Sequence, residues 1–200
     1  MLEYMIIKKE IDMKILEDVQ REIELIKKEK ESMLYVADDP ERYNELCNKI
    51  NRLLEIQQVL SCPKVASSDE LDIYAELKGI NYTIYHLTLH EEVEPIGYVR
   101  VSYDDGQSSF GNIGYSIWPR YRGHNFTIKA LEMLEDIMIE KKLTKPIITA
   151  NPQNIASIRI IEKFGGELVR GAQIGAPYNY YQVDLLKKKD KPKKAMSKHL

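Results

Sequence analysis

The stretch from Trp118 to Leu131 reads WPRYRGHNFTIKAL and places a proline, an arginine and a glycine directly before a predicted helix. A tight turn alone would account for the glycine. An anion bound at the helix start would account for the whole arrangement, because the free N–H groups and the dipole of a helix N-terminus attract negative charge. The stretch by itself leaves both explanations open.

The individual residues of this loop suit an anion. Arg122 supplies a cation, and Gly123 has no side chain to keep a ligand away from the backbone. His124 and Asn125 add hydrogen-bond donors, and asparagine tolerates left-handed backbone angles better than most residues. A nucleotide-phosphate site of the P-loop kind is disfavoured, because no Walker-type lysine follows the glycine.

Patterns of strand and helix alternate around this loop. Runs rich in β-branched and aromatic residues predict strands, and short links between the first three predict an antiparallel meander. Apolar residues at helical spacing predict two helices, the second closed by Gly165 and Gly166. The predicted strands are 80–90, 96–103, 112–118, 145–151, 167–169 and 180–186, and the predicted helices are 126–141 and 154–164. This order predicts an α/β fold with helices packed on a sheet.

Two amphipathic helices are predicted in the first 65 residues. Apolar residues recur every three or four positions over 7–26 and again over 46–60, with Asp39 as a helix cap and Pro40 as first helical residue. We therefore predict three parts: a helical hairpin over 1–65, a globular domain over 66–186, and a flexible tail over 187–200. The tail carries seven basic residues and one acidic residue.

Composition argues against several classes of protein. A hydrophobic content of 44% is typical of a globular chain, and a net charge of −2 makes a nucleic-acid partner unexpected. The two cysteines are too few for a disulfide framework and lack metal-ligand spacing. The sequence has no apolar run of membrane-spanning length and no signal-peptide pattern at its start. We expect a soluble, cytoplasmic protein without a membrane partner.

Two segments together resemble the GNAT superfamily of acyl-CoA-dependent N-acyltransferases. They are IGYSIWPRYRGHNFTIKAL at 113–131 and NPQNIASIRIIEKFGGEL at 151–168, and they look most similar to the branch that contains the ribosomal-protein N-acetyltransferases. The resemblance implies a GNAT-like, mixed and mostly antiparallel sheet with flanking helices. It implies transfer of an acetyl group from acetyl-CoA, as cosubstrate, to an amine of a small molecule or a protein, with no metal. Assembly as a homodimer is left open.

The resemblance also implies which residues bind the cosubstrate. In that family the turn before the first helix holds the coenzyme A pyrophosphate, and the second segment holds the pantetheine arm. A backbone N–H near Ile117, on the strand before the turn, would face the oxygen that becomes negative during acetyl transfer. Carried over to this sequence, the cosubstrate-binding residues are Ile117, Arg122, Gly123, His124, Asn125, Phe126, Thr127, Asn154 and Ser157.

Three positions depart from the family pattern. Asn125 stands in place of a second glycine, Thr127 in place of a small residue, and Ile161 in place of the tyrosine that many members use as general acid. Because the related branch places a serine at the position of Ser157, the resemblance makes Ser157 the first candidate for the catalytic proton donor, and Tyr180, from the tyrosines at 178–181, is the second. The departures also favour an alternative, a degenerate non-catalytic fold that acts as an acyl-CoA-binding or protein-interaction module.

Acidic residues and histidines near the strand 80–90 offer two further hypotheses. Glu91 and Glu92 are candidates for a general base or for contact with a cationic amine, although a solvated loop is the simpler expectation. His86 and His90 would lie about 13 Å apart on a strand, too far to share one metal ion. We therefore expect both histidines to be structural.

Overall fold

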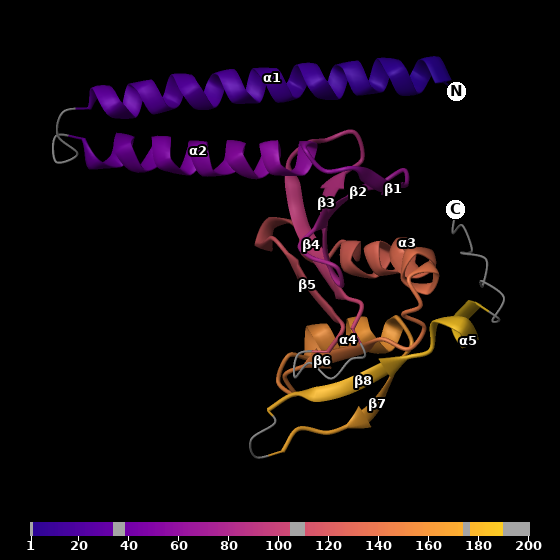
Figure 1. The fold of residues 1–200 in the computed structure, drawn as a ribbon. Coiled ribbons are helices and arrows are strands. Elements are labelled where there is room, and N and C mark those ends of the chain that lie inside the picture. The colour runs from indigo at the N-terminus through magenta and orange to yellow at the C-terminus, as the bar shows by residue number, and fades with distance from the viewer. Residues whose placement is uncertain (1, 34–38, 105–110, 174–176, 190–200) are drawn as a thin grey trace, which may run out of the picture. The chain divides into compact units, whose positions relative to one another are not determined.

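The computed structural model describes residues 2–33, 39–104, 111–173 and 177–189, with side chains from Met13 onward. The described residues form two compact units: those up to Glu76 together with Thr88–Ile96, and Leu77–Leu87 together with those from Gly97 onward. The strands of these residues form an eight-stranded sheet of order β1-β2-β3-β4-β5-β6-β8-β7 (Figure 1). The sheet is mixed and mostly antiparallel and is flanked by helices, which confirms the predicted fold class.

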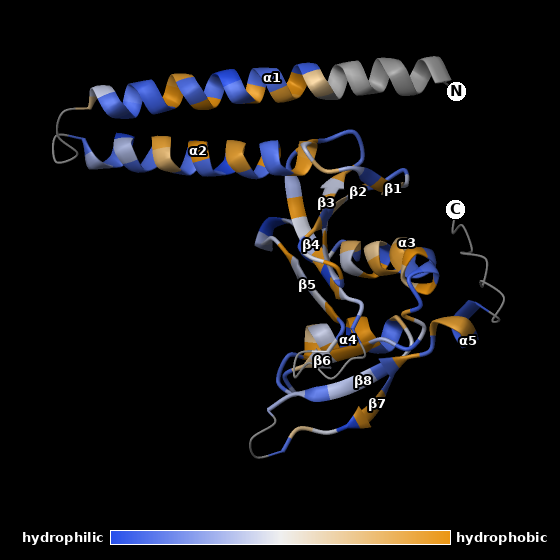
Figure 2. Ribbon diagram, viewed as in Figure 1, coloured by the Kyte–Doolittle hydropathy of each residue, from blue (hydrophilic) through white to orange (hydrophobic). Residues whose placement is uncertain are grey.

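The first unit begins with two helices, α1 (Leu2–Ser32) and α2 (Pro40–Leu60), which lie side by side (Figure 1). The Asp39 carboxylate accepts the N–H of Arg42 at 2.9 Å and Pro40 is the first helical residue, so the predicted helix start is confirmed. Apolar residues recur along both helices (Figure 2). The residues buried between them are Val19, Ile23, Ile26, Leu46, Leu53 and Ile56. The side chains of the stripe before Met13 lie outside the described residues.

Two strands of the first unit, β1 (Lys64–Ser67) and β2 (Leu71–Leu77), have no counterpart in the strands predicted from the sequence. They pair antiparallel around Asp72, whose side chain is fully buried. That carboxylate accepts bonds from Lys64 Nζ at 2.7 Å, Ser67 Oγ at 2.5 Å and the backbone N–H of Glu91 at 3.2 Å. A charged residue in the second position of a strand obscured the strand pattern in the sequence, and its partners show why it can be buried.

Strands β3 and β4 cross from one unit to the other, and the remaining elements belong to the second unit. Helix α3 packs against β5, and α4 packs against β6 and β7. The bounds are β3 (Tyr82–Leu89), β4 (Pro95–Ser102), β5 (Ile113–Ile117), a 3-10 turn (Pro119–Tyr121), α3 (Phe126–Glu140), β6 (Ile147–Ala150), α4 (Ile155–Lys163), β7 (Gly166–Arg170), β8 (Asn179–Val183) and α5 (Leu185–Lys189).

The start of the predicted basic tail is helical. Lys187, Lys188 and Lys189 lie in α5, and their ammonium groups pair with Glu167, Glu135 and Asp136 respectively. The predicted tail thus begins inside a helix, its flexibility stays a prediction, and the rest of it, 190–200, lies outside the described residues.

Candidate functional site

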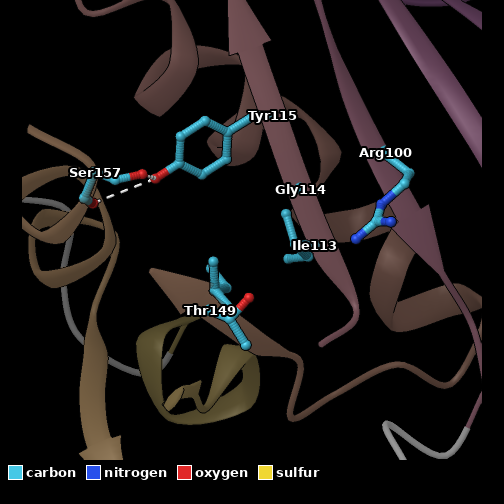
Figure 3. A pocket seen from close by; sticks show the side chains of 7 residues that line it. Arg100, Ile113, Gly114, Tyr115, Thr149 and Ser157 are labelled. Carbon is cyan, nitrogen blue, oxygen red and sulfur yellow. Dashed lines mark hydrogen bonds between the residues drawn. The ribbon is translucent and has the colours of Figure 1, made fainter. Parts of the chain in front are cut away.

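A pocket lies where β5 and β6 part from each other. All five residues of β5 pair antiparallel with β4, but the parallel register between β5 and β6 consists of Ile113 with Ile148 in the described residues. On its other edge, β6 pairs antiparallel with β8 along its whole length. The pocket has a volume of about 170 Å³. Its lining residues, shown in Figure 3, are Arg100, Ile113, Gly114, Tyr115, Ile148, Thr149 and Ser157.

Asn112 holds β5 and β6 together at the end where the two strands are still paired. Its backbone N–H donates to the carbonyl of Ile147 at 2.7 Å, and its side-chain oxygen accepts the N–H of Ile147 at 2.9 Å. The side-chain nitrogen donates to the carbonyls of Ser102 and Asp104 at the end of β4, at 3.1 and 3.2 Å. Asn112 is 2% exposed, so these bonds satisfy a buried amide and join the start of β5 to both of its neighbours.

Tyr115 and Ser157 meet at one side of the pocket. The Tyr115 hydroxyl lies 2.8 Å from Ser157 Oγ and also donates to the Ser157 carbonyl at 3.3 Å (Figure 3). Burial raises the pKa of Tyr115, and the bond with Ser157 offsets only part of this rise. The phenol is therefore protonated at neutral pH and available as a hydrogen-bond donor.

Asn154 fixes Ser157 in this position. Its side-chain oxygen caps α4 by accepting the backbone N–H of Ser157 at 3.1 Å. The cap sets where the first turn of α4 begins, and with it the direction of the serine side chain. The structure thus brings together two residues that the resemblance assigned to the pantetheine arm. It adds Tyr115, which the sequence analysis did not single out.

The loop after β5 folds back on the end of that strand. Pro119–Tyr121 form the 3-10 turn, and the Arg122 Nε–H donates to the carbonyl of Ile117 at 3.0 Å. Ile117 is buried, whereas Arg122 is exposed. One nitrogen of the guanidinium is therefore used to hold the loop, and the planar group is oriented by that bond.

Two residues of the loop have left-handed backbone angles. Gly123 has φ 88°, and no atom lies within 4 Å of the point where a Cβ would stand. Asn125 has φ 60° and ψ 17°, in the left-handed region that favours glycine. The replacement of glycine by asparagine is thus compatible with the backbone of this loop.

The start of α3 lacks the side-chain cap found at α2 and α4. Asn125 occupies the N-cap position of α3 without making a side-chain hydrogen bond, and its carbonyl accepts the N–H of Lys129. A missing cap costs a helix about 1 kcal/mol, because the first N–H groups lose a protein acceptor. An anion at this position would supply one.

The other residues predicted for the loop differ in exposure. His124 is exposed, and its ring stacks on Phe126 with 5.5 Å between centroids. Thr127 is only 6% exposed and lies in the first turn of α3, where its backbone N–H is among those without an acceptor within the helix.

Tyr180, the second candidate for the proton donor, lies on β8 opposite Thr149. The guanidinium of Arg170 covers its ring at 3.6 Å from the centroid.

Ile161 is fully buried, and its Cγ2 lies 2.4 Å from where a Cβ on Gly166 would stand. Ile161, which stands where many family members have a tyrosine, is therefore a core residue packed against Gly166 at the start of β7.

Arg100 is a second pocket residue that the sequence analysis did not single out. It stands on β4 directly opposite Gly114, and its buried Nε has no hydrogen-bond partner among the described residues. An arginine in an alternating strand is ordinarily solvated, so no local signal marks it. Its place is set by the pairing of β4 with β5.

The predicted candidates for a base and for structural histidines lie in or near the loop after β3. Glu91 and Glu92 are exposed residues of the first unit, and their catalytic role stays a prediction. His90 Nδ1 lies 3.3 Å from the Asp72 carboxylate, which gives this histidine a structural contact.

In the ranges where side chains are described, no three His, Cys, Asp or Glu residues are grouped to hold a metal ion. No helix in the described part of the chain is long and apolar enough to cross a membrane.

Comparison with solved structures gives distant matches. RimL, a ribosomal L7/L12 alpha-N-protein acetyltransferase, matches with 11% identity and a TM-score of 0.48, over 60% of this chain and 93% of that one. A GNAT-family acetyltransferase from Bacillus anthracis matches with 21% identity and a TM-score of 0.43, over 52% of this chain and 66% of that one. An acetyltransferase from Agrobacterium tumefaciens matches with 18% identity and a TM-score of 0.44, over 50% and 60%. The chain thus spans less than two thirds of the last two proteins.

A search of curated proteins finds no significant match. A family model described as an acetyltransferase (GNAT) domain matches residues 25–167, which is well over half of the chain and includes the pocket, the loop and both helices that follow them. The chain belongs to the GNAT acetyltransferase family.

Proposed function

We propose that this protein transfers an acetyl group from acetyl-CoA to the nitrogen of an amine. The observation that carries the proposal is that one strand, β5, connects the pocket to the loop. The pocket opens beside Gly114 and Tyr115, and the loop with the uncapped helix follows Ile117. Three residues of strand span about 10 Å. A ligand with its phosphates at the loop and its reactive group along β5, between Ile117 and Tyr115, suits this arrangement.

The loop residues fit the phosphates of coenzyme A. Gly123 leaves open space at the backbone, and Asn125 takes a left-handed conformation without using its side chain as a cap. The N–H groups that begin α3, including that of Thr127, would then meet the anion, with Arg122 as a cation beside them. His124 and Phe126 would line the same loop.

The pocket residues fit the thioester end. When bound, acetyl-CoA supplies an acetyl group activated as a thioester. During transfer the C–S bond breaks, an N–C bond forms, the sulfur gains a proton and the amine loses one. Ser157 Oγ would donate a hydrogen bond to the departing sulfur. The Tyr115 phenol has one proton, and when it points to the serine Oγ and not to the Ser157 carbonyl, the serine's own proton is left for the sulfur.

Other groups complete this proposal. The backbone N–H of Ile117 would face the carbonyl oxygen as negative charge develops on it. Asn154 would position Ser157 through the cap of α4. Tyr180 is the alternative donor to the sulfur.

The test is release of CoA from acetyl-CoA in the presence of a panel of amines, with the acetylated product identified by mass spectrometry. Turnover with at least one amine is expected. Binding of acetyl-CoA without turnover on any amine would favour the acyl-CoA-binding module. If neither CoA nor acetyl-CoA at millimolar concentration raises the melting temperature, the assignment of the loop as the phosphate site is wrong.

A further inference from the structure

The guanidinium of Arg100 lies in the pocket without a partner for its buried nitrogen. Arg100 is on β4, its cross-strand neighbour is Gly114 on β5, and both line the pocket (Figure 3). Its Nε has no hydrogen-bond partner among the described residues. Buried donors in folded proteins are almost always paired, and a charged donor left alone is the costliest kind. A ligand atom that accepts a hydrogen bond would satisfy it.

Gly114 lets this guanidinium pack directly against β5. A Cβ at that position would lie 3.2 Å from both Nε and Nη2 of Arg100, closer than ordinary van der Waals contact. A larger residue would therefore displace the guanidinium. The glycine allows the fork of Arg100 to lie flat across the strand that forms one wall of the pocket.

The charges of the pocket wall favour an anion. Arg100 is the only one of the seven lining residues with a formal charge, since the others are Ile113, Gly114, Tyr115, Ile148, Thr149 and Ser157. Tyr115 stays neutral because burial raises its pKa. Because the described lining residues include no carboxylate, they would repel a second cation in this small space, whereas a carboxylate could accept two parallel bonds from the guanidinium.

We propose that Arg100 binds a carboxylate of the acceptor, so that the preferred acceptor is an amine with a carboxylate close to its nitrogen, such as an amino acid, and not a polyamine. This inference rests on the proposed acetyl transfer. The volume of about 170 Å³ limits how far apart the two groups can be if both enter the pocket. The positive charge beside the amine also favours its neutral, nucleophilic form.

Matched pairs of amines that differ by one carboxylate test this directly. We would measure CoA release with tyrosine and tyramine, histidine and histamine, and lysine and cadaverine, for the unmodified protein and for Arg100→Gln and Arg100→Lys. The unmodified protein should prefer the carboxylated member of each pair in kcat/KM. Arg100→Gln should reduce that preference by about 10- to 100-fold, the usual effect of a hydrogen bond to a charged group. Arg100→Lys should retain part of it.

Two results would overturn the inference. One is a preference of the unmodified protein for the decarboxylated amines. The other is an equal loss of activity on both members of every pair in Arg100→Gln, which would place the guanidinium on the acetyl group instead of the acceptor. Arg120→Gln, a substitution of an exposed arginine outside the pocket, is the matched control and should leave the preference as it is.

A binding experiment separates this inference from the proposed function. If no amine is acetylated, acetyl transfer is overturned, and N-acetylglycine titrated into the CoA-saturated protein by calorimetry still tests Arg100. Binding to the unmodified protein that weakens at least tenfold in Arg100→Gln would support the carboxylate site. No binding to either protein, or equal binding to both, would overturn it.

Discussion

The Tyr115 hydroxyl lies 2.8 Å from Ser157 Oγ, so the strand that leads to the loop and the helix that follows β6 are joined inside the pocket. The two residues are 42 positions apart in sequence. Because the phenol remains protonated at neutral pH, it can hold the serine hydroxyl in one orientation while the serine acts on a ligand. The pair is therefore the most direct point at which to test the proposed chemistry.

Ser157→Ala should lower kcat by about 10²- to 10⁴-fold, the usual range for loss of a proton donor, with a much smaller effect on the Kd of CoA. Tyr115→Phe should lower kcat by roughly tenfold, since it removes one hydrogen bond that orients the serine. In the double variant the Tyr115 substitution should add little, because the serine it orients is gone. Stopped-flow CoA release would measure all three.

Tyr180, on β8, is the alternative proton donor, and its substitution gives the result that would contradict the role of Ser157. Tyr180→Phe should change kcat less than Ser157→Ala does. If Tyr180→Phe abolishes turnover while Ser157→Ala turns over normally, Tyr180 is the donor and the role assigned to Ser157 is wrong.

Arg122→Glu should abolish the stabilisation of the protein by acetyl-CoA, because it reverses the charge beside the proposed phosphate site. At a hundredfold excess over its Kd, acetyl-CoA should stabilise the unmodified protein by about 2.7 kcal/mol, visible as a rise in melting temperature. Arg120→Glu, two residues earlier on the same exposed loop, is the matched control and should keep most of the rise. Equal losses in both variants would indicate a general effect of charge on the loop.

The sequence predicted the elements that carry local signals. Strands β3 to β8, the helices α3 and α4 and the capped start of α2 follow from β-branched runs, helical spacing and the Asp39-Pro40 pair, and they lie within a few residues of their predicted bounds. The capping of α4 by Asn154 is likewise a short-range bond. Such features depend on neighbours in sequence, which is why they can be predicted from it.

The features that sequence analysis missed depend on pairing between distant segments. Asn112 joins three strands through backbone groups, and Arg100 meets Gly114 only because of the β4–β5 register. Asp72 is buried because Lys64, Ser67 and Glu91 reach it from two other segments. Polar residues in such positions look like surface residues until the partners are known.

Asn125→Gly should leave both stability and acetyl-CoA affinity within a few-fold of the unmodified protein. The backbone angles already suit glycine, and relief of left-handed strain is offset by the greater freedom of glycine in the unfolded chain. Asn125→Val should cost about 1–2 kcal/mol, because a β-branched residue resists these angles. Urea unfolding and a thermal titration with acetyl-CoA would measure both. A gain in affinity of tenfold or more in Asn125→Gly would show that asparagine weakens the site.

Removing the chain after Lys189 should change neither stability nor CoA affinity measurably, since the phosphates are assigned to the loop and not to the basic end. Removing it after Asp184 should destabilise the protein by about 2–3 kcal/mol, because Leu185 is fully buried and Lys188 pairs with Glu135. Chemical unfolding of the two truncated forms gives the comparison. A large loss of CoA affinity in the shorter truncation alone would assign residues 190–200 a part in binding.

Because of Asp72, the free energy of unfolding of the protein should decrease at acid pH. Burial works to raise the pKa of Asp72, but bonds from Lys64, Ser67 and the Glu91 N–H outweigh it and lower the pKa from 3.8 to about 2. A lowered folded-state pKa contributes stability that is complete above the unfolded pKa and is lost as the pH falls through the folded one. The contribution is about 2 kcal/mol and should disappear between roughly pH 4 and pH 2.

Asp72→Asn separates this carboxylate from the other acidic groups. The variant should lose about 2 kcal/mol at pH 7 and show a correspondingly shallower loss between pH 4 and pH 2, because it has no charge to neutralise there. Asp69→Asn, which changes an exposed carboxylate three residues away, should follow the unmodified protein over the whole range. Urea unfolding from pH 2 to pH 7 would measure the three proteins. If Asp72→Asn retains the full acid loss, other carboxylates cause it, and the buried contacts of Asp72 are not its source.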